Sequence, residues 1–99
     1  MNEIMYELNE YVKYFFKCGL EVLKTPIKQN KTLHFTIYDE EKNKCEEVDI
    51  NTYMYERLLT KIDKYFKNKN IKINKEEIEN ITKRFLDIYY QKFLKDLYD

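Results

Sequence analysis

The sequence predicts a predominantly helical α+β fold of order α-β-β-α-α, with one antiparallel two-stranded hairpin packed on three helices. Apolar residues recur at helical spacing in three long segments. Between the first two segments, apolar and polar residues alternate on either side of a polar stretch, which is the pattern of a hairpin. The 99 residues fit a single compact domain, 1–99.

The first helix is expected over residues 3–24. Its apolar stripe consists of Ile4, Leu8, Tyr11, Val12, Phe15, Phe16, Gly19, Val22 and Leu23. Thr25 and Pro26 should end the helix, because a proline pushes the preceding residue out of the α region. Gly19 costs about 1 kcal/mol relative to alanine inside a helix, and we interpret it as the mark of a close crossing with another element.

Two strands are expected next, over residues 32–38 and 45–50. The first alternates apolar and polar residues, and the second places Val48 and Ile50 on one face. The connecting loop is long and lacks Asn-Gly, so the sequence leaves the strand register open. Because two strands alone are only marginally stable in water, the hairpin must pack on the helices or pair with a second copy.

The last two helices have recognisable starts. The second is expected to be capped by Asn51 or Thr52 and to run to about residue 68. The third begins with a capping box formed by Asn74 and Glu77, together with a hydrophobic staple, and runs to about residue 97. The staple is Ile73 with Ile78, and the two apolar stripes are Met54, Leu58, Ile62 and Phe66, then Ile78, Ile81, Phe85, Ile88, Tyr89 and Leu97.

The composition excludes several kinds of chemical site. The chain has no serine and one glycine, which removes a serine nucleophile and a glycine-rich phosphate loop. Two cysteines, Cys18 and Cys45, and one histidine, His34, are too few for a structural zinc site, and we interpret the cysteines as free thiols. Residues 39–43 space their side chains as in a calcium loop, but the glycine and the final glutamate of that loop are missing. We therefore expect no enzymatic activity, no metal and no cofactor.

The sequence also bears on location and origin. No apolar run approaches the roughly 20 residues of a membrane span, and the acidic N-terminus lacks the basic start and apolar block of a signal peptide. We expect a cytoplasmic protein that does not bind membranes. Lysine, asparagine, isoleucine, tyrosine and phenylalanine dominate, and their AT-rich codons indicate a low-GC genome or one of its phages or plasmids. For a phage protein, the location would be the host cytoplasm.

Charge is balanced over the whole chain but segregated along it. Residues 39–49 contain six acids and two lysines, a net charge of −4, whereas residues 61–75 contain six lysines and one aspartate, a net charge of +5. The ten tyrosines exceed what a core of this size requires, and tyrosine is enriched at protein interfaces. The tyrosines outside the apolar stripes are Tyr6, Tyr14, Tyr38, Tyr53 and Tyr98.

These observations favour a non-catalytic protein-binding module as the leading hypothesis. A small, motif-free protein from a low-GC phage or mobile element would fit an inhibitor of a host defence protein, such as an anti-CRISPR inhibitor. The residues expected to contact the partner are Tyr38, Asp39, Glu40, Glu41, Glu46, Glu47 and Tyr53. The alternative is a small nucleic-acid-binding regulator that uses Lys61, Lys64, Lys67, Lys69 and Lys72 in the segment 61–75. A homodimer that pairs its hairpins is a third hypothesis.

Overall fold

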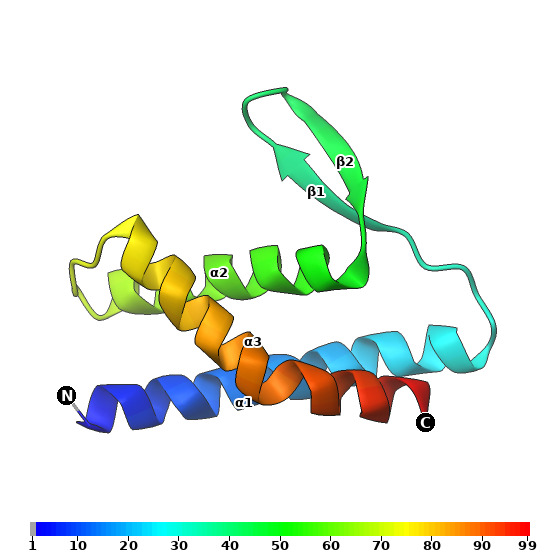
Figure 1. Ribbon diagram of the computed structural model, residues 1–99, viewed down its shortest axis with the longest axis horizontal. Helices are drawn as coiled ribbons and strands as arrows, with labels where there is room; N and C mark the ends of the chain where they lie inside the picture. Colours follow the sequence, from blue (N-terminus) through cyan, green and yellow to red (C-terminus); the bar gives the residue numbers. More distant parts are fainter. Residues whose placement is uncertain (1) are drawn as a thin grey trace.

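The computed structural model describes residues 2–99, and its elements are three helices and one antiparallel hairpin. Their order is α1 (Asn2–Lys28), β1 (Phe35–Asp39), β2 (Lys44–Val48), α2 (Ile50–Asn68) and α3 (Lys75–Tyr98). The predicted α+β fold class and element order are confirmed. Helix α3 crosses the other two helices, and the hairpin rises from the N-terminal end of α2, with β1 toward α2 and the loop pointing away from the helices (Figure 1).

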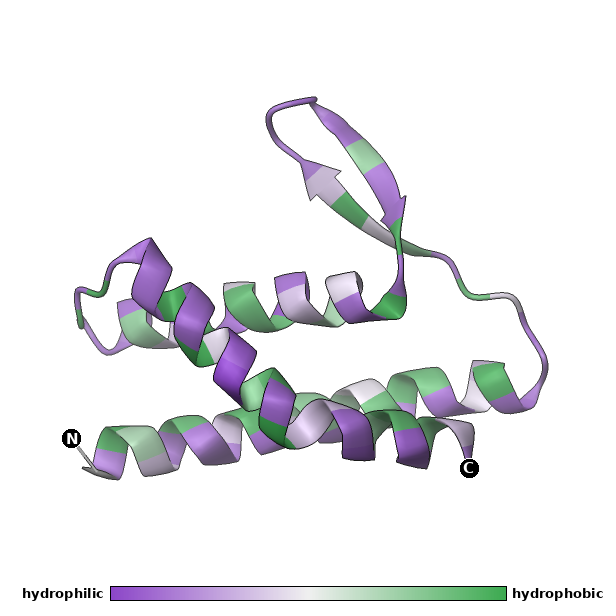
Figure 2. Cartoon of the chain, in the orientation of Figure 1, coloured by the Kyte–Doolittle hydropathy of each residue, from purple (hydrophilic) through white to green (hydrophobic). Residues whose placement is uncertain are grey.

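The hydrophobic core lies where the three helices cross. Each helix is amphipathic and presents its apolar face to the other two (Figure 2). Thr82 is the buried polar side chain among them, and its hydroxyl donates to the Ile78 carbonyl at 2.7 Å, so that its burial leaves no unpaired donor. The buried apolar residues are Leu8, Val12, Phe16, Met54, Leu58, Ile62, Phe66, Ile78, Phe85, Phe93 and Leu97.

Two residues assigned to the apolar stripes are instead exposed. Val22 is 69% exposed and Ile88 is 62% exposed, so their predicted places in the core are wrong. Both lie to one side of the seam that their helix buries, because a helix turns by about 100° per residue and only a limited arc reaches the neighbouring helices. Val22 borders an open groove between α1 and α2 instead.

Helix α1 is longer than expected and contains Pro26 in its last turn. The expectation that Thr25 and Pro26 would end the helix is wrong. A proline in a terminal turn disturbs few backbone hydrogen bonds, and Ile27, the next residue, packs partly buried against the core. The chain leaves the helix at Asn30, whose φ of 57° is left-handed, and Lys31 N donates to the Pro26 carbonyl at 3.0 Å.

The strands of the hairpin are shifted relative to the prediction. Phe35 lies opposite Val48, and Asp39 lies opposite Lys44, so the loop consists of the four residues 40–43. Strand β1 therefore begins later than residue 32, and β2 ends before Ile50 because that residue starts α2. Side chains on the inner face of the hairpin are partly buried, whereas those on the outer face are exposed.

The predicted cap of α2 is wrong, whereas the predicted cap of α3 is confirmed. Asp49, rather than Asn51 or Thr52, caps α2, and its Oδ1 accepts a hydrogen bond from Thr52 N at 2.7 Å. The proposed cap residues lie two and three residues too late, because Ile50 is already helical. The cap of α3 is confirmed, since Asn74 Oδ1 accepts from Glu77 N at 2.8 Å. Over the described residues, no helix has the length and apolarity to cross a membrane.

Candidate protein-binding surfaces

The hairpin is attached to α2 through its base. The rings of Phe35 and Tyr53 lie with centroids 5.0 Å apart, and the Arg57 guanidinium lies 5.9 Å from the centroid of the Tyr53 ring. These contacts combine aromatic packing with a cation–π interaction. Tyr53, which was expected to contact a partner, is therefore partly buried and holds the hairpin on the helix.

The outer face of the hairpin is open to solvent. Tyr38 is 57% exposed, and its hydroxyl donates to the side-chain oxygen of Asn43 across the loop. His34 Nδ1 lies 2.7 Å from Glu47 Oε1, so the expected contact residue Glu47 already has a partner within the hairpin. Cys45 lies opposite Tyr38 as a free thiol. This face therefore presents one large aromatic side chain, Tyr38, and one carboxylate, Glu47, that already has a partner within the protein.

The acidic residues near the tip of the hairpin differ in whether their carboxylates have partners within the protein. Asp39 Oδ1 accepts hydrogen bonds from the backbone of Glu41 at 3.0 Å and of Lys42 at 3.3 Å, which fixes the loop. Lys42 Nζ lies 2.8 Å from Glu46 Oε1, and this hydrogen bond raises the pKa of Lys42. Glu40 and Glu41 are exposed, and within residues 2–99 their carboxylates form no ion pair. Glu40 and Glu41 are thus the tip carboxylates for which the structure shows neither a hydrogen bond nor an ion pair within the described residues.

Two of the five candidate nucleic-acid-binding lysines are already in ion pairs. Lys67 Nζ lies 2.9 Å from Asp63 Oδ2, one turn earlier on α2. Lys69 Nζ lies 3.0 Å from Glu7 Oε2 of α1, and the hydrogen bond between them lowers the pKa of Glu7 and raises the pKa of Lys69. Tyr65 also donates to Glu7 at 3.0 Å. This cluster joins the end of α2 to α1.

The other three lysines have no ion-pair partner within residues 2–99; Lys61 and Lys64 lie one turn apart on α2, and Lys72 lies beyond the end of that helix. Lys61 borders the groove between α1 and α2, Lys64 is exposed on α2, and Lys72 is exposed in the connection to α3. Phosphate contacts need cations that are free to exchange their counterions. The structure therefore offers a nucleic acid a smaller positive surface than the net charge of the segment suggests.

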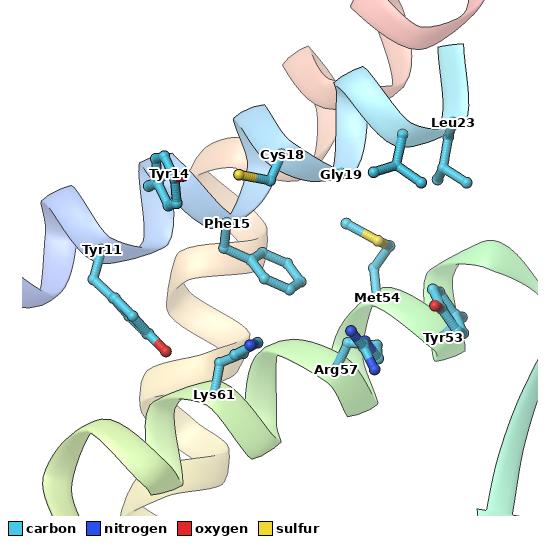
Figure 3. Close-up of a pocket in the computed structure, with 11 residues that line it drawn as sticks. Tyr11, Tyr14, Phe15, Cys18, Gly19, Leu23, Tyr53, Met54, Arg57 and Lys61 are labelled. Atoms are coloured by element: carbon cyan, nitrogen blue, oxygen red, sulfur yellow. The ribbon is translucent and has the colours of Figure 1, made fainter. Parts of the chain in front are cut away.

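A groove between α1 and α2, which we call the interhelical groove, was not predicted from the sequence. It has a volume of about 300 Å³. Figure 3 shows Phe15 and Met54 within it, with Tyr11 and Tyr14 on the α1 side and Arg57 on the α2 side. It exists because α3 covers α1 and α2 from one side and leaves the opposite side open. The Cys18 thiol next to Tyr14 raises the pKa of that tyrosine.

A second groove, which we call the strand–helix groove, runs between β1 and α2 with a volume of about 450 Å³. The six consecutive residues 33–38 line one side. Glu56, Arg57 and Thr60 of α2 line the other side. Residues 35–38 belong to β1, and because side chains of adjacent strand residues point to opposite faces, a groove that touches all four must follow the edge of the strand. The alternating pattern of β1 predicted its inner face but carried no information about this edge.

The tyrosines outside the apolar stripes do not form one aromatic face. Tyr6, Tyr14, Tyr38 and Tyr98 are exposed, as expected, whereas Tyr53 is partly buried. Tyr6 belongs to the first turns of α1 and Tyr98 is the last residue of α3, and the start of α1 and the end of α3 lie at opposite ends of the view in Figure 1. Only Tyr38 belongs to the hairpin, so the aromatic contribution to that surface is a single ring.

The described residues contain no group of three or more histidine, cysteine or acidic side chains placed to hold a metal ion. Cys18 and Cys45 are both free. Comparison with protein families, with curated proteins and with solved structures finds no match for this chain. Its candidate sites must therefore be judged by their geometry and chemistry.

Proposed function

We propose that the protein is a non-catalytic protein-binding module whose hairpin tip contacts a basic surface on another protein. The observation that carries the proposal is a projecting arm, attached at its base to α2, with two unpaired carboxylates and one exposed ring at its end. The contact residues are Glu40, Glu41 and Tyr38. Asp39 and Glu46 shape the tip around them, and Glu47 lies closer to the base, where it contacts His34.

The chemistry of the tip supports a charged protein partner. Opposite charges across an interface steer association and set specificity, and an exposed tyrosine adds contact area at a small entropic cost. The pairing of β1 with β2 orders the arm before binding, which reduces the ordering cost of binding, and the exposed pairs of Glu46 and Glu47 add little to it.

The proposal extends to an inhibitor encoded by a low-GC phage or mobile element and directed at a host defence protein, such as a CRISPR–Cas component. The small size and an amino-acid composition rich in residues with AT-rich codons support this origin. An acidic arm is suited to the basic groove in which such a protein would hold nucleic acid, because it offers carboxylates to the same lysines and arginines. The proposed site of action is accordingly the host cytoplasm.

The test uses a charge reversal at the tip together with a matched control. Glu40→Lys/Glu41→Lys reverses the two free carboxylates, whereas Glu10→Lys/Asp87→Lys makes the same charge change on exposed helical positions. A partner is captured from a low-GC bacterial lysate and purified, and its affinity for each variant is measured by calorimetry. We expect the tip variant to bind about tenfold more weakly or worse, and the control to bind like the wild type.

Equal affinities for the two variants would overturn the role of the tip. For the inhibitor, nucleic acid should compete with the protein for the purified partner; simultaneous binding of both would contradict that extension.

The alternative function, a nucleic-acid-binding regulator, depends on the exposed and unpaired Lys64 and Lys72. It requires salt-sensitive binding of a DNA or RNA duplex that weakens in Lys64→Glu/Lys72→Glu. Binding that is absent at low salt would remove this alternative.

A further inference from the structure

Strand β1 has an edge with no backbone partner. Its one neighbouring strand is β2. Outside this pairing, no backbone hydrogen bond within the described residues reaches β1 or the preceding residues 32–34. The N–H and C=O groups that point away from β2 are therefore free to pair with an added strand.

The two edges of the hairpin differ in charge. Strand β2 carries Lys44, Glu46 and Glu47 along its five residues, and charged side chains on an edge discourage pairing with another chain. Strand β1 is uncharged from Phe35 to Tyr38. The edge of β1 thus lacks the protection that the edge of β2 has.

The position of the free edge restricts what can pair with it. Of the two strands, β1 is the one that lies toward α2 (Figure 1). Its residues 35–38 line the strand–helix groove. A volume of about 450 Å³ lies within the usual range for small ligand sites and admits a short extended segment rather than a folded domain. A strand seated there would pair with β1 on one side and face Glu56, Arg57 and Thr60 on the other.

Arg57 is a cation in the lining of the groove, and Glu56 beside it is an anion, so a negative group of the occupant is favoured at the guanidinium itself rather than along the whole groove. The Arg57 guanidinium lies over the Tyr53 ring and forms no ion pair within residues 2–99. A guanidinium binds a carboxylate through two parallel hydrogen bonds, which fixes both charge and orientation. A peptide that carries a carboxylate, either on a side chain or at its C-terminus, can form these two hydrogen bonds with the Arg57 guanidinium.

We propose that the strand–helix groove binds an extended peptide segment of a partner protein, which adds to β1 as a third strand and places a carboxylate on Arg57. The proposal rests on the protein-binding function proposed above and gives it a second site, independent of the hairpin tip. Main-chain hydrogen bonds along β1 provide affinity, and Arg57 provides selectivity.

The probe is a displayed library of random peptides of about seven residues, the length of a short strand, selected on the full-length protein. Selected peptides should carry an acidic side chain or require a free C-terminal carboxylate. Nuclear magnetic resonance with hydrogen exchange should then show that the bound peptide protects alternate amides of β1. That alternation is specific to strand addition, because docking through side chains alone leaves these amides unprotected.

Three substitutions test the groove. Thr60→Tyr fills it from the α2 side, and Thr25→Tyr makes the same change at an exposed position of α1 outside the groove. We expect Thr60→Tyr to abolish peptide binding and Thr25→Tyr to leave it unchanged. Arg57→Gln should weaken binding about tenfold, and Arg57→Lys should recover part of the loss.

The proposal is overturned if selection yields no binding peptide, if Thr60→Tyr retains binding, or if alternate β1 amides stay unprotected in the complex. Protection of β1 in the protein alone, rising with concentration alongside dimers in light scattering, would identify a second copy as the occupant and would also overturn it. Glu40→Lys/Glu41→Lys should retain peptide binding, and Thr60→Tyr should retain the partner of the tip. The two proposals therefore fail separately.

Discussion

Asp49 illustrates how one side chain determines where a helix starts. Its carboxylate accepts the backbone N–H of Thr52, which lowers the pKa of Asp49. Asn74 does the same for α3 through Glu77, and the sequence predicted that cap because a glutamate follows three residues later. The sequence did not single out Asp49, because residues 49, 51 and 52 are all common cap types and only the backbone conformation selects among them.

The lowered pKa of Asp49 predicts a pH-dependent contribution to stability. A carboxyl whose pKa is lower in the folded state stabilises the fold above its unfolded value of 3.8, and this stabilisation is lost as the pH falls through the folded pKa. Asp49→Asn retains the capping oxygen but does not titrate. The wild type should therefore have a higher urea midpoint than Asp49→Asn at neutral pH, and this difference should disappear at about pH 2.

Urea denaturation followed by circular dichroism measures the midpoint of each protein at both pH values. Asp87→Asn, an exposed position inside α3, is the control, and its midpoint should stay close to that of the wild type at each pH. A difference between wild type and Asp49→Asn that is independent of pH would show that the charge of the cap is unimportant.

Among the elements, the three helices were the most predictable, because their apolar stripes extend over many turns. The end of α1 was not, since Pro26 is tolerated in a terminal turn and Ile27 reaches the core beyond it. The hairpin was predicted, but its register was not. A four-residue loop with a left-handed Asn43 fixes that register, and this conformation has no unique sequence pattern.

We interpreted Gly19 as marking a point where α1 crosses another element closely, and the structure places Met54 of α2 and Phe93 of α3 beside it. A Cβ at this position would lie 3.5 Å from Met54 Cε and 3.6 Å from Phe93 Cε1, which are ordinary contact distances. Gly19→Ala should therefore stabilise the protein by up to about 1 kcal/mol through its higher helix propensity. Gly19→Leu should destabilise it by about 1–3 kcal/mol, because the added atoms overpack the crossing.

Both free energies of unfolding come from urea titrations at neutral pH. A loss of stability in Gly19→Ala would show that the three helices approach more closely at this point than ordinary contact allows.

At the scale of the whole molecule, the sequence predicted the acidic tip but neither groove. Local charge is visible in a sequence, whereas the strand–helix groove joins residues 33–38 to Arg57 and depends on where the hairpin sits above α2. The pairing of Lys69 with Glu7 is equally invisible, because it joins the end of α2 to the start of α1. Helical periodicity tells which residues face inward but not how the helices cross.

The hairpin is two-stranded, and such a sheet is only marginally stable unless it packs on another element. Its main attachment is the packing of Phe35 on Tyr53, and an aromatic pair contributes about 0.5–1.5 kcal/mol beyond its buried area. Removing this ring should release the arm while leaving the helical core of Leu8, Leu58 and Leu97 in place. The hairpin and the helices are thus expected to open with different free energies.

Phe35→Ala tests this separation, with Tyr38→Ala on the exposed outer face as the control. In Phe35→Ala, the amides that pair β1 with β2 should exchange with solvent at least about tenfold faster, because their opening free energy falls by about 1.4 kcal/mol or more. The buried amides of α2 and α3 and the helical circular dichroism should change little. Tyr38→Ala should leave the exchange of the hairpin amides and of the helical amides close to wild type.

Faster exchange throughout the three helices in Phe35→Ala would instead show that the hairpin and the helical core unfold as one unit. Both proposed binding sites would then depend on the stability of the core, since the tip and the groove each require the arm to be held above α2.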